Sequence, residues 1–196
     1  IVAGGVALAL NLRDRRQTDD LDPVPTLLAG VVIVIGLGSF LFHTIAERWS
    51  SLADVIPIGI FMLVYFAFAM RRYFGLGLGW SAVATLAFAV AIGLAQSSRA
   101  LNGSVGYLPA LLAMMVVGGI MVARRAGVAR FVFAAAAVFM VSLTLRSLDR
   151  SFCDSTALFG APIGTHFLWH LLNATTLYLL LHAARIQHQF ATGAAH

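Results

Sequence analysis

The chain has 196 residues, of which 60% are hydrophobic and 11% are charged, so the composition excludes an ordinary soluble domain and favours a multi-pass membrane protein. All 13 basic residues are arginines, so a retinal Schiff base on lysine is excluded, and the net charge of +5 comes from arginines between apolar runs rather than from a nucleic-acid-binding patch. The single cysteine, Cys153, excludes an internal disulfide and a metal site with several cysteines.

Apolar runs separated by short polar segments predict seven membrane-spanning helices, since a bilayer core of roughly 30 Å needs about 20 helical residues. The runs cover residues 1–12, 26–46, 52–70, 77–96, 107–123, 128–145 and 162–184. The first run is short, and we expect its helix to begin upstream of Ile1. The predicted fold is therefore an all-α membrane protein, a seven-transmembrane-helix bundle whose first helix is truncated at its N-terminus in this chain.

The same pattern predicts the domain organisation. We expect one domain over residues 1–185 and a polar C-terminal tail over 186–196, because no polar stretch is long enough to be a linker. Residues 47–51 and 146–155 are predicted polar connections. Pro57 would fall in the first turn of the third helix, where proline is tolerated.

The arginines predict the orientation in the membrane. Nine of the 13 lie on one side, after the first, third and fifth helices and in the tail, and four lie on the other. The positive-inside rule then favours an outside N-terminus and a cytoplasmic C-terminus. Short loops and helices rich in Ala, Gly and Arg without Lys favour a bacterial inner-membrane protein.

Successive helices cross the membrane in opposite directions, so the helix count predicts that several unusual polar residues lie at one membrane depth. The second helix ends on the side where the third and seventh begin. Its end carries Ser39 and His43, four residues apart and on one face. The third helix begins with Asp54, and the seventh carries His166 and His170, also four apart. Ionisable residues inside a membrane are costly and indicate a functional site.

These residue types suit metal-assisted hydrolysis. His43, His166 and His170 could supply three nitrogen ligands to Zn²⁺, with a fourth position open for water, as in catalytic zinc sites. Zinc lowers the pKa of its bound water to about 7. Asp54 could accept the proton of that water as a general base. Ser39 could donate a hydrogen bond to the oxyanion formed from a lipid amide or ester.

Simpler interpretations stay open for each residue. A single buried histidine is more often structural than a ligand, Ser39 could bond only to its own helix backbone, and Asp54 could cap its helix. Haem between His43 and one histidine of the seventh helix would leave the other histidine and Asp54 without a role, so zinc is favoured over haem.

Other polar residues have plainer explanations. Asp149, Arg150 and Asp154 could form a solvated loop with internal ion pairs. The remaining histidines of the C-terminal part lie toward the opposite side and are expected to be outside the site: His182, His188 and His196.

Three motifs, in the same order and spacing, resemble the alkaline ceramidase family over roughly residues 26–185. They are Gly36-Leu37-Gly38-Ser39-Phe40-Leu41-Phe42-His43-Thr44 followed by Asp54 and Pro57, then Leu148-Asp149-Arg150-Ser151-Phe152-Cys153-Asp154, and His166-Phe167-Leu168-Trp169-His170. The family belongs to a wider group of seven-helix membrane hydrolases that includes the adiponectin and progestin receptors.

The resemblance implies an intramembrane zinc amidohydrolase that cleaves ceramide, or a similar N-acyl lipid, to a fatty acid and an amine base. By position, His43, His166 and His170 would hold Zn²⁺, with Asp54 and Ser39 catalytic. Asp149 and Trp169 would lie around these ligands.

The resemblance leaves two questions open. Eukaryotic members bind calcium through an acidic, Trp-containing segment before and within the first helix, and this segment is not visible here. The alternatives in function are a lipid-responsive receptor or regulator with structural zinc, and a haem-binding membrane protein.

Overall fold

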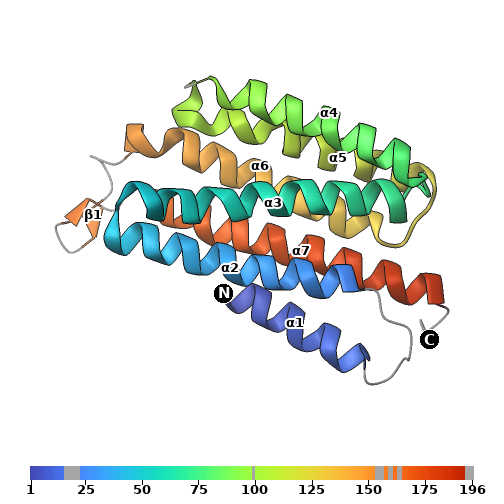
Figure 1. The fold of residues 1–196 in the computed structure, drawn as a ribbon. Helices are drawn as coiled ribbons and strands as arrows, with labels where there is room; N and C mark the ends of the chain where they lie inside the picture. The colour runs from blue at the N-terminus through green and yellow to red at the C-terminus, as the bar shows by residue number, and fades with distance from the viewer. Residues whose placement is uncertain (16–22, 99, 153–156, 159–160, 163–164, 193–196) are drawn as a thin grey trace. The chain divides into compact units, whose positions relative to one another are not determined.

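The computed structural model describes residues 1–15, 23–98, 100–152, 157–158, 161–162 and 165–192, and these form α-helices almost throughout (Figure 1). The helices are α1 (Val2–Arg15), α2 (Pro23–Ile45), α3 (Arg48–Arg72), α4 (Leu78–Gln96), the 3-10 helix η1 (Leu101–Tyr107), α5 (Leu108–Ala123), α6 (Ala129–Phe152) and α7 (His166–Thr192). A two-residue hairpin pairs β1 (Ala157–Leu158) antiparallel with β2 (Ala161–Pro162). The predicted all-α class is confirmed for the described residues.

Five helical segments of the described chain are long and apolar enough to cross a membrane, which supports a multi-pass membrane protein. They are Pro23–Ile45, Arg48–Arg72, Leu78–Gln96, Leu101–Ala123 and Ala129–Asp149. The 14 described residues of α1 are too short to span a bilayer. The 27-residue α7 is long enough, but His166, His170, Asn173 and His182 make it more polar. The count of seven spans stays a prediction.

The predicted start of the third helix, the place of Pro57 and the predicted end of the sixth helix were wrong. The third helix begins at Arg48 rather than 52, because the Glu47 N–H donates to Ser50 Oγ at 3.0 Å and starts the helix a turn earlier. Pro57 therefore lies well inside α3 rather than in its first turn. The segment expected as a polar connection after Leu145 instead continues α6 to Phe152.

The seventh helix begins later than expected, at His166 rather than 162. It also continues to Thr192, into the segment that we expected as a polar tail.

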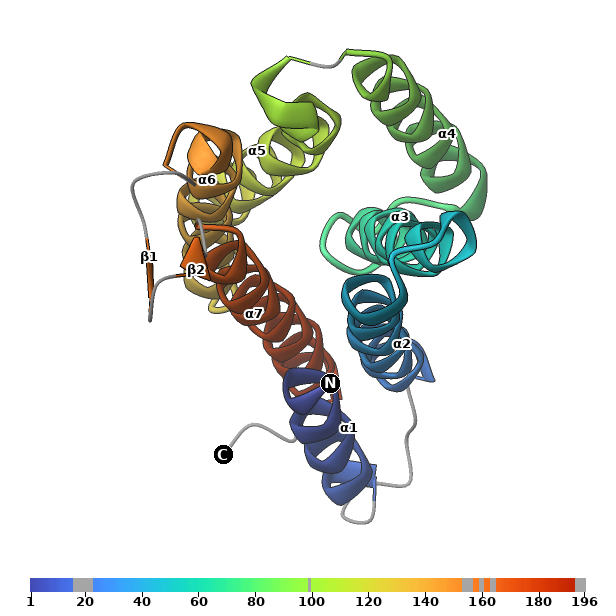
Figure 2. The same ribbon diagram turned by 90° about the vertical axis from the view of Figure 1, so that its left-hand side faces the viewer.

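The chain forms two compact units. The first comprises Ile1–Thr85 and Leu180–His196, and the second comprises Leu86–Leu179. In the first unit α2 and α3 lie side by side (Figure 2). The second half of α7 is joined to this unit by two sets of polar contacts, one to α3 and one to α1. The first set is a chain of hydrogen bonds from α3. Tyr73 donates a hydrogen bond to the Tyr65 hydroxyl at 2.9 Å, and Tyr65 donates to the Leu180 carbonyl at 3.1 Å.

The second set of contacts is a bidentate ion pair between α1 and α7. Arg185 Nε lies 2.5 Å from Asp14 Oδ2, and its Nη2 lies 3.2 Å from Oδ1. Both side chains are about a quarter exposed or less, at 20% and 24%. The pair gives the polar end of α7 a fixed partner on α1.

In the second unit α5 packs along α6, and η1 contacts both helices. Two small residues of α6, Ala135 and Ala136, are buried. Tyr107, Phe139 and Trp169 form an aromatic cluster, with ring centroids 5.3 to 6.4 Å apart. This cluster joins η1 and α6 to the first part of α7.

Candidate functional site

The first two turns of α7 carry the paired histidines. His166 and His170 are separated by one helical turn, and their ring centroids lie 4.8 Å apart at an interplanar angle of 78°. Both residues are half-buried. The four-residue spacing therefore brings two imidazoles together on one helix face, as expected.

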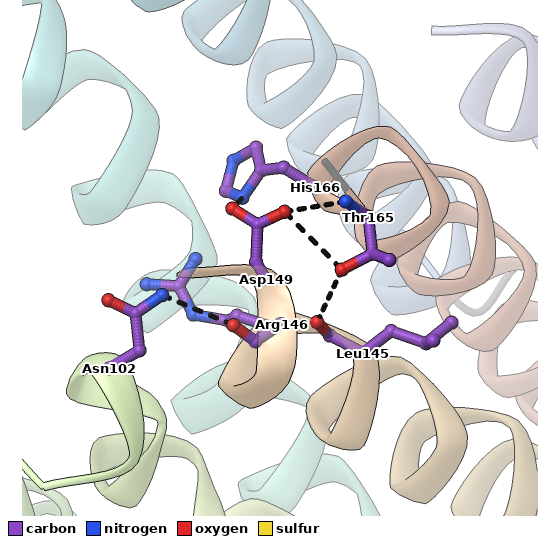
Figure 3. Close-up of polar contacts among 6 residues, drawn as sticks. All are labelled: Asn102, Leu145, Arg146, Asp149, Thr165 and His166. Atoms are coloured by element: carbon purple, nitrogen blue, oxygen red, sulfur yellow. Dashed lines mark hydrogen bonds and ion pairs between the residues drawn. The ribbon is translucent and has the colours of Figure 1, made fainter. Parts of the chain in front are cut away.

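Thr165 sets where α7 begins. Its carbonyl accepts hydrogen bonds from the backbone N–H groups of Leu168 and Trp169, at 3.1 and 3.4 Å. Its hydroxyl donates to the Leu145 carbonyl of α6 at 2.8 Å (Figure 3). Thr165 thus starts the helix and ties that start to α6. Our sequence reasoning gave it no role, although threonine directly before an apolar helical run is a helix-start signal.

Asp149 on α6 faces this helix start. Its Oδ1 accepts the Thr165 backbone N–H at 2.6 Å and lies 3.3 Å from the Thr165 hydroxyl. Its Oδ2 lies 4.0 Å from His166 Nδ1 (Figure 3). A carboxylate beside the ring nitrogen of a histidine is the usual means of orienting a metal-binding imidazole. The extension of α6 past Leu145 brings Asp149 into this contact.

Trp169 lies on the buried side of the same two turns. It is 3% exposed, and its carbonyl accepts a hydrogen bond from the buried Ser142 hydroxyl at 3.1 Å. Its ring packs against Tyr107 and Phe139. The contacts thus make Trp169 an anchor of α7, next in sequence to His170.

The other predicted residues lie in the first unit, on α2 and α3. Ser39 and His43 are one turn apart on α2, with Ser39 half-buried and His43 exposed. Asp54 is half-buried on α3. The two helices come close at Gly38, where an added Cβ would lie 2.0 Å from the Ala53 carbonyl oxygen and 3.1 Å from the Asp54 backbone nitrogen. Only glycine fits this contact, which lies next in sequence to Ser39 on α2 and to Asp54 on α3.

Pro57 explains why that carbonyl faces α2. Proline has no N–H, so the Ala53 carbonyl lacks the α-helical hydrogen bond that residue 57 would otherwise donate. The same oxygen is the atom nearest to Gly38. A proline in one helix and a glycine in its neighbour together allow the close approach of the two backbones.

Other sequence candidates contribute less. His182 is in α7, about 18 Å along the helix axis from His170. The side chains of Arg150 and His188 lie outside the described residues, as do Cys153, Asp154 and His196.

A family model described as Ceramidase matches residues 3–195. A search of curated proteins gave no match, and neither did a search of solved structures. The family match covers nearly the whole chain and confirms the resemblance carried by the three motifs. It supports a membrane enzyme that hydrolyses ceramide in general terms. The chain belongs to the Ceramidase family.

Proposed function

We propose that the protein is an intramembrane, zinc-dependent amidohydrolase that cleaves the amide of ceramide or a similar N-acyl lipid. The observation that carries the proposal is the imidazole pair of His166 and His170, with the Asp149 carboxylate 4.0 Å from His166 Nδ1. The family match supports the reaction class.

The donor types fit zinc. His43, His166 and His170 offer three imidazoles and no thiolate, which is typical of catalytic zinc sites. We propose these three as the ligands. Zinc bound there would act as a Lewis acid and would lower the pKa of a coordinated water to about 7.

The other residues of the chain have separate tasks in this proposal. Asp54 accepts the proton of the attacking water and passes it to the leaving amine, since the amine must leave protonated. Ser39 donates a hydrogen bond to the amide oxygen as negative charge develops on it. Asp149 holds the His166 ring in one orientation. The close contact at Gly38 keeps Ser39 and Asp54 in register across α2 and α3.

The proposal is tested by pairing two histidine variants of the same helix. His166→Ala should lose zinc and the hydrolysis of a long-chain N-acyl sphingoid. His182→Ala, about 24 Å along α7 from His166, should keep both. Zinc by mass spectrometry and fatty acid release measure the outcome, and the visible spectrum tests for haem. Hydrolysis that persists in zinc-free His166→Ala protein would contradict the mechanism.

A further inference from the structure

Arg146 on α6 stacks on the aromatic cluster beside the paired histidines. Its guanidinium carbon lies 5.0 Å from the ring centroid of Trp169 and 5.4 Å from that of Tyr107. Its Nε is buried and has no hydrogen-bond partner among the residues that the structure describes. The ring faces therefore hold this part of the guanidinium in place, an arrangement that suits the planar, weakly hydrated arginine side chain.

The backbone of Arg146 is also held in place, by a hydrogen bond from η1. Asn102 Nδ2 donates a hydrogen bond to the Arg146 carbonyl at 3.2 Å (Figure 3). Asn102 and Gly103 adopt left-handed backbone angles, with φ of 56° and 75°, which turn η1 toward α6. The contact fixes the α6 backbone at the residue that carries the stacked guanidinium.

The stack controls how α7 is rotated about its own axis. Successive helical residues are about 100° apart, so His170 lies about 100° and His166 about 60° around the axis from Trp169, on the same side. A rotation of about 20° would move atoms roughly 6 Å from the axis by about 2 Å. Zinc–nitrogen bonds of about 2.0–2.1 Å tolerate deviations of only about 0.2 Å. Small movements of Trp169 would therefore misplace both imidazoles.

We propose that Arg146 is a positioning residue for the metal ligands and acts through Trp169. The guanidinium clamps the indole against Tyr107, and the clamped indole fixes the direction in which His166 and His170 point. The inference rests on the proposed zinc site. It gives a role to a residue that our sequence interpretation had placed in a polar connection and used only to predict orientation.

The test compares arginine variants of α6 in the full chain. Arg146→Met keeps an unbranched apolar stem but removes the guanidinium and its charge, and Arg146→Lys keeps the charge but not the planar stack. Arg130→Met is the matched control, because Arg130 also stacks on an aromatic ring of α6, Phe131, at 4.7 Å. Zinc affinity is measured by competition with a chelator, and helicity by circular dichroism.

We expect Arg146→Met to bind zinc about tenfold to a hundredfold more weakly than the wild type. Arg146→Lys should recover part of the loss and covers the case in which Arg146→Met fails to fold. Arg130→Met should match the wild type. Wild-type zinc affinity in a folded Arg146→Met protein would overturn the positioning role. No zinc in the wild-type chain would instead overturn the proposed function, and the positioning role with it.

A second readout needs no metal. With Trp49 and Trp80 replaced by Phe, Trp169 is the remaining tryptophan, and its fluorescence reports on the clamp. Arg146→Met should make Trp169 more accessible to an added quencher, and Arg130→Met should not.

A double-mutant comparison of zinc affinity tests the link between the two residues. Trp169→Leu should weaken zinc binding, and adding Arg146→Met to it should weaken binding little further, since both changes remove the same contact. Fully additive losses would show that Arg146 does not act through Trp169.

Discussion

Replacing Gly38 with alanine tests the close approach of α2 and α3. The new Cβ would lie 2.0 Å from the Ala53 carbonyl oxygen and 2.6 Å from its carbon. These are backbone atoms, so no side-chain rotation relieves the clash. Because carbon and oxygen come no closer than about 3.3 Å even in weak hydrogen bonds, the helices must separate locally by roughly 1 Å.

The clash should outweigh the intrinsic preference of helices for alanine. Overpacking typically costs about 1–3 kcal/mol, against a gain of about 0.5–1 kcal/mol for replacing a helical glycine. The net loss of about 1–2 kcal/mol should lower the melting temperature by about 2–8 °C in a protein of this size. A displacement of about 1 Å between Ser39 and Asp54 should also slow turnover by about 10²-fold.

Gly30→Ala is the matched control on the same helix. An added Cβ at Gly30 meets no atom within 4 Å, so this variant should gain stability and keep full turnover. Melting in detergent and hydrolysis of an N-acyl sphingoid measure both variants. If Gly38→Ala is as stable and active as Gly30→Ala, the close contact does not set the register of the two helices.

Three further predictions concern single contacts. Asp54→Asn should retain zinc but lose about 10²–10⁴-fold in turnover, since the amide cannot accept the proton; loss of zinc in this variant would make Asp54 a ligand or a fold element. Thr165→Ala should cost about 1 kcal/mol in unfolding free energy, seen as a lower melting temperature, while Thr165→Ser stays near the wild type. Equal losses in both would rule out the hydroxyl contact. Arg185→Lys should lower the melting temperature because an ammonium cannot make both contacts to Asp14, and turnover of the folded protein should be unchanged. An unchanged melting temperature would mean that the pair adds no stability.

The sequence was sufficient to predict the helical class and the pairing of His166 with His170. Helical spacing alone determines which residues of one helix share a face, so that part needs no tertiary information. The position of Thr165 before an apolar run also carried a helix-start signal that could have been used. The resemblance to a family rested on motif spacing, and the family match confirms it.

Contacts between helices were not predictable in the same way. Gly30, Gly36 and Gly38 look alike in the sequence, and only the packing of α3 shows that Gly38 is nearest to a backbone carbonyl. The end of α6 was misplaced because polar residues after Leu145 suggested a loop. Asp149 accepts a hydrogen bond from Thr165, and the Arg146 carbonyl accepts one from Asn102. Both partners lie far away in the sequence, and these tertiary contacts support the longer helix.

The most direct test of the account is removal and return of zinc in the purified wild-type protein. About one zinc per chain should be present, and a chelator should abolish the release of fatty acid from a long-chain ceramide. Returning Zn²⁺ should restore the release, with the sphingoid base formed in equal amount. Undiminished cleavage of the amide by chain from which all metal has been removed would contradict the central claim.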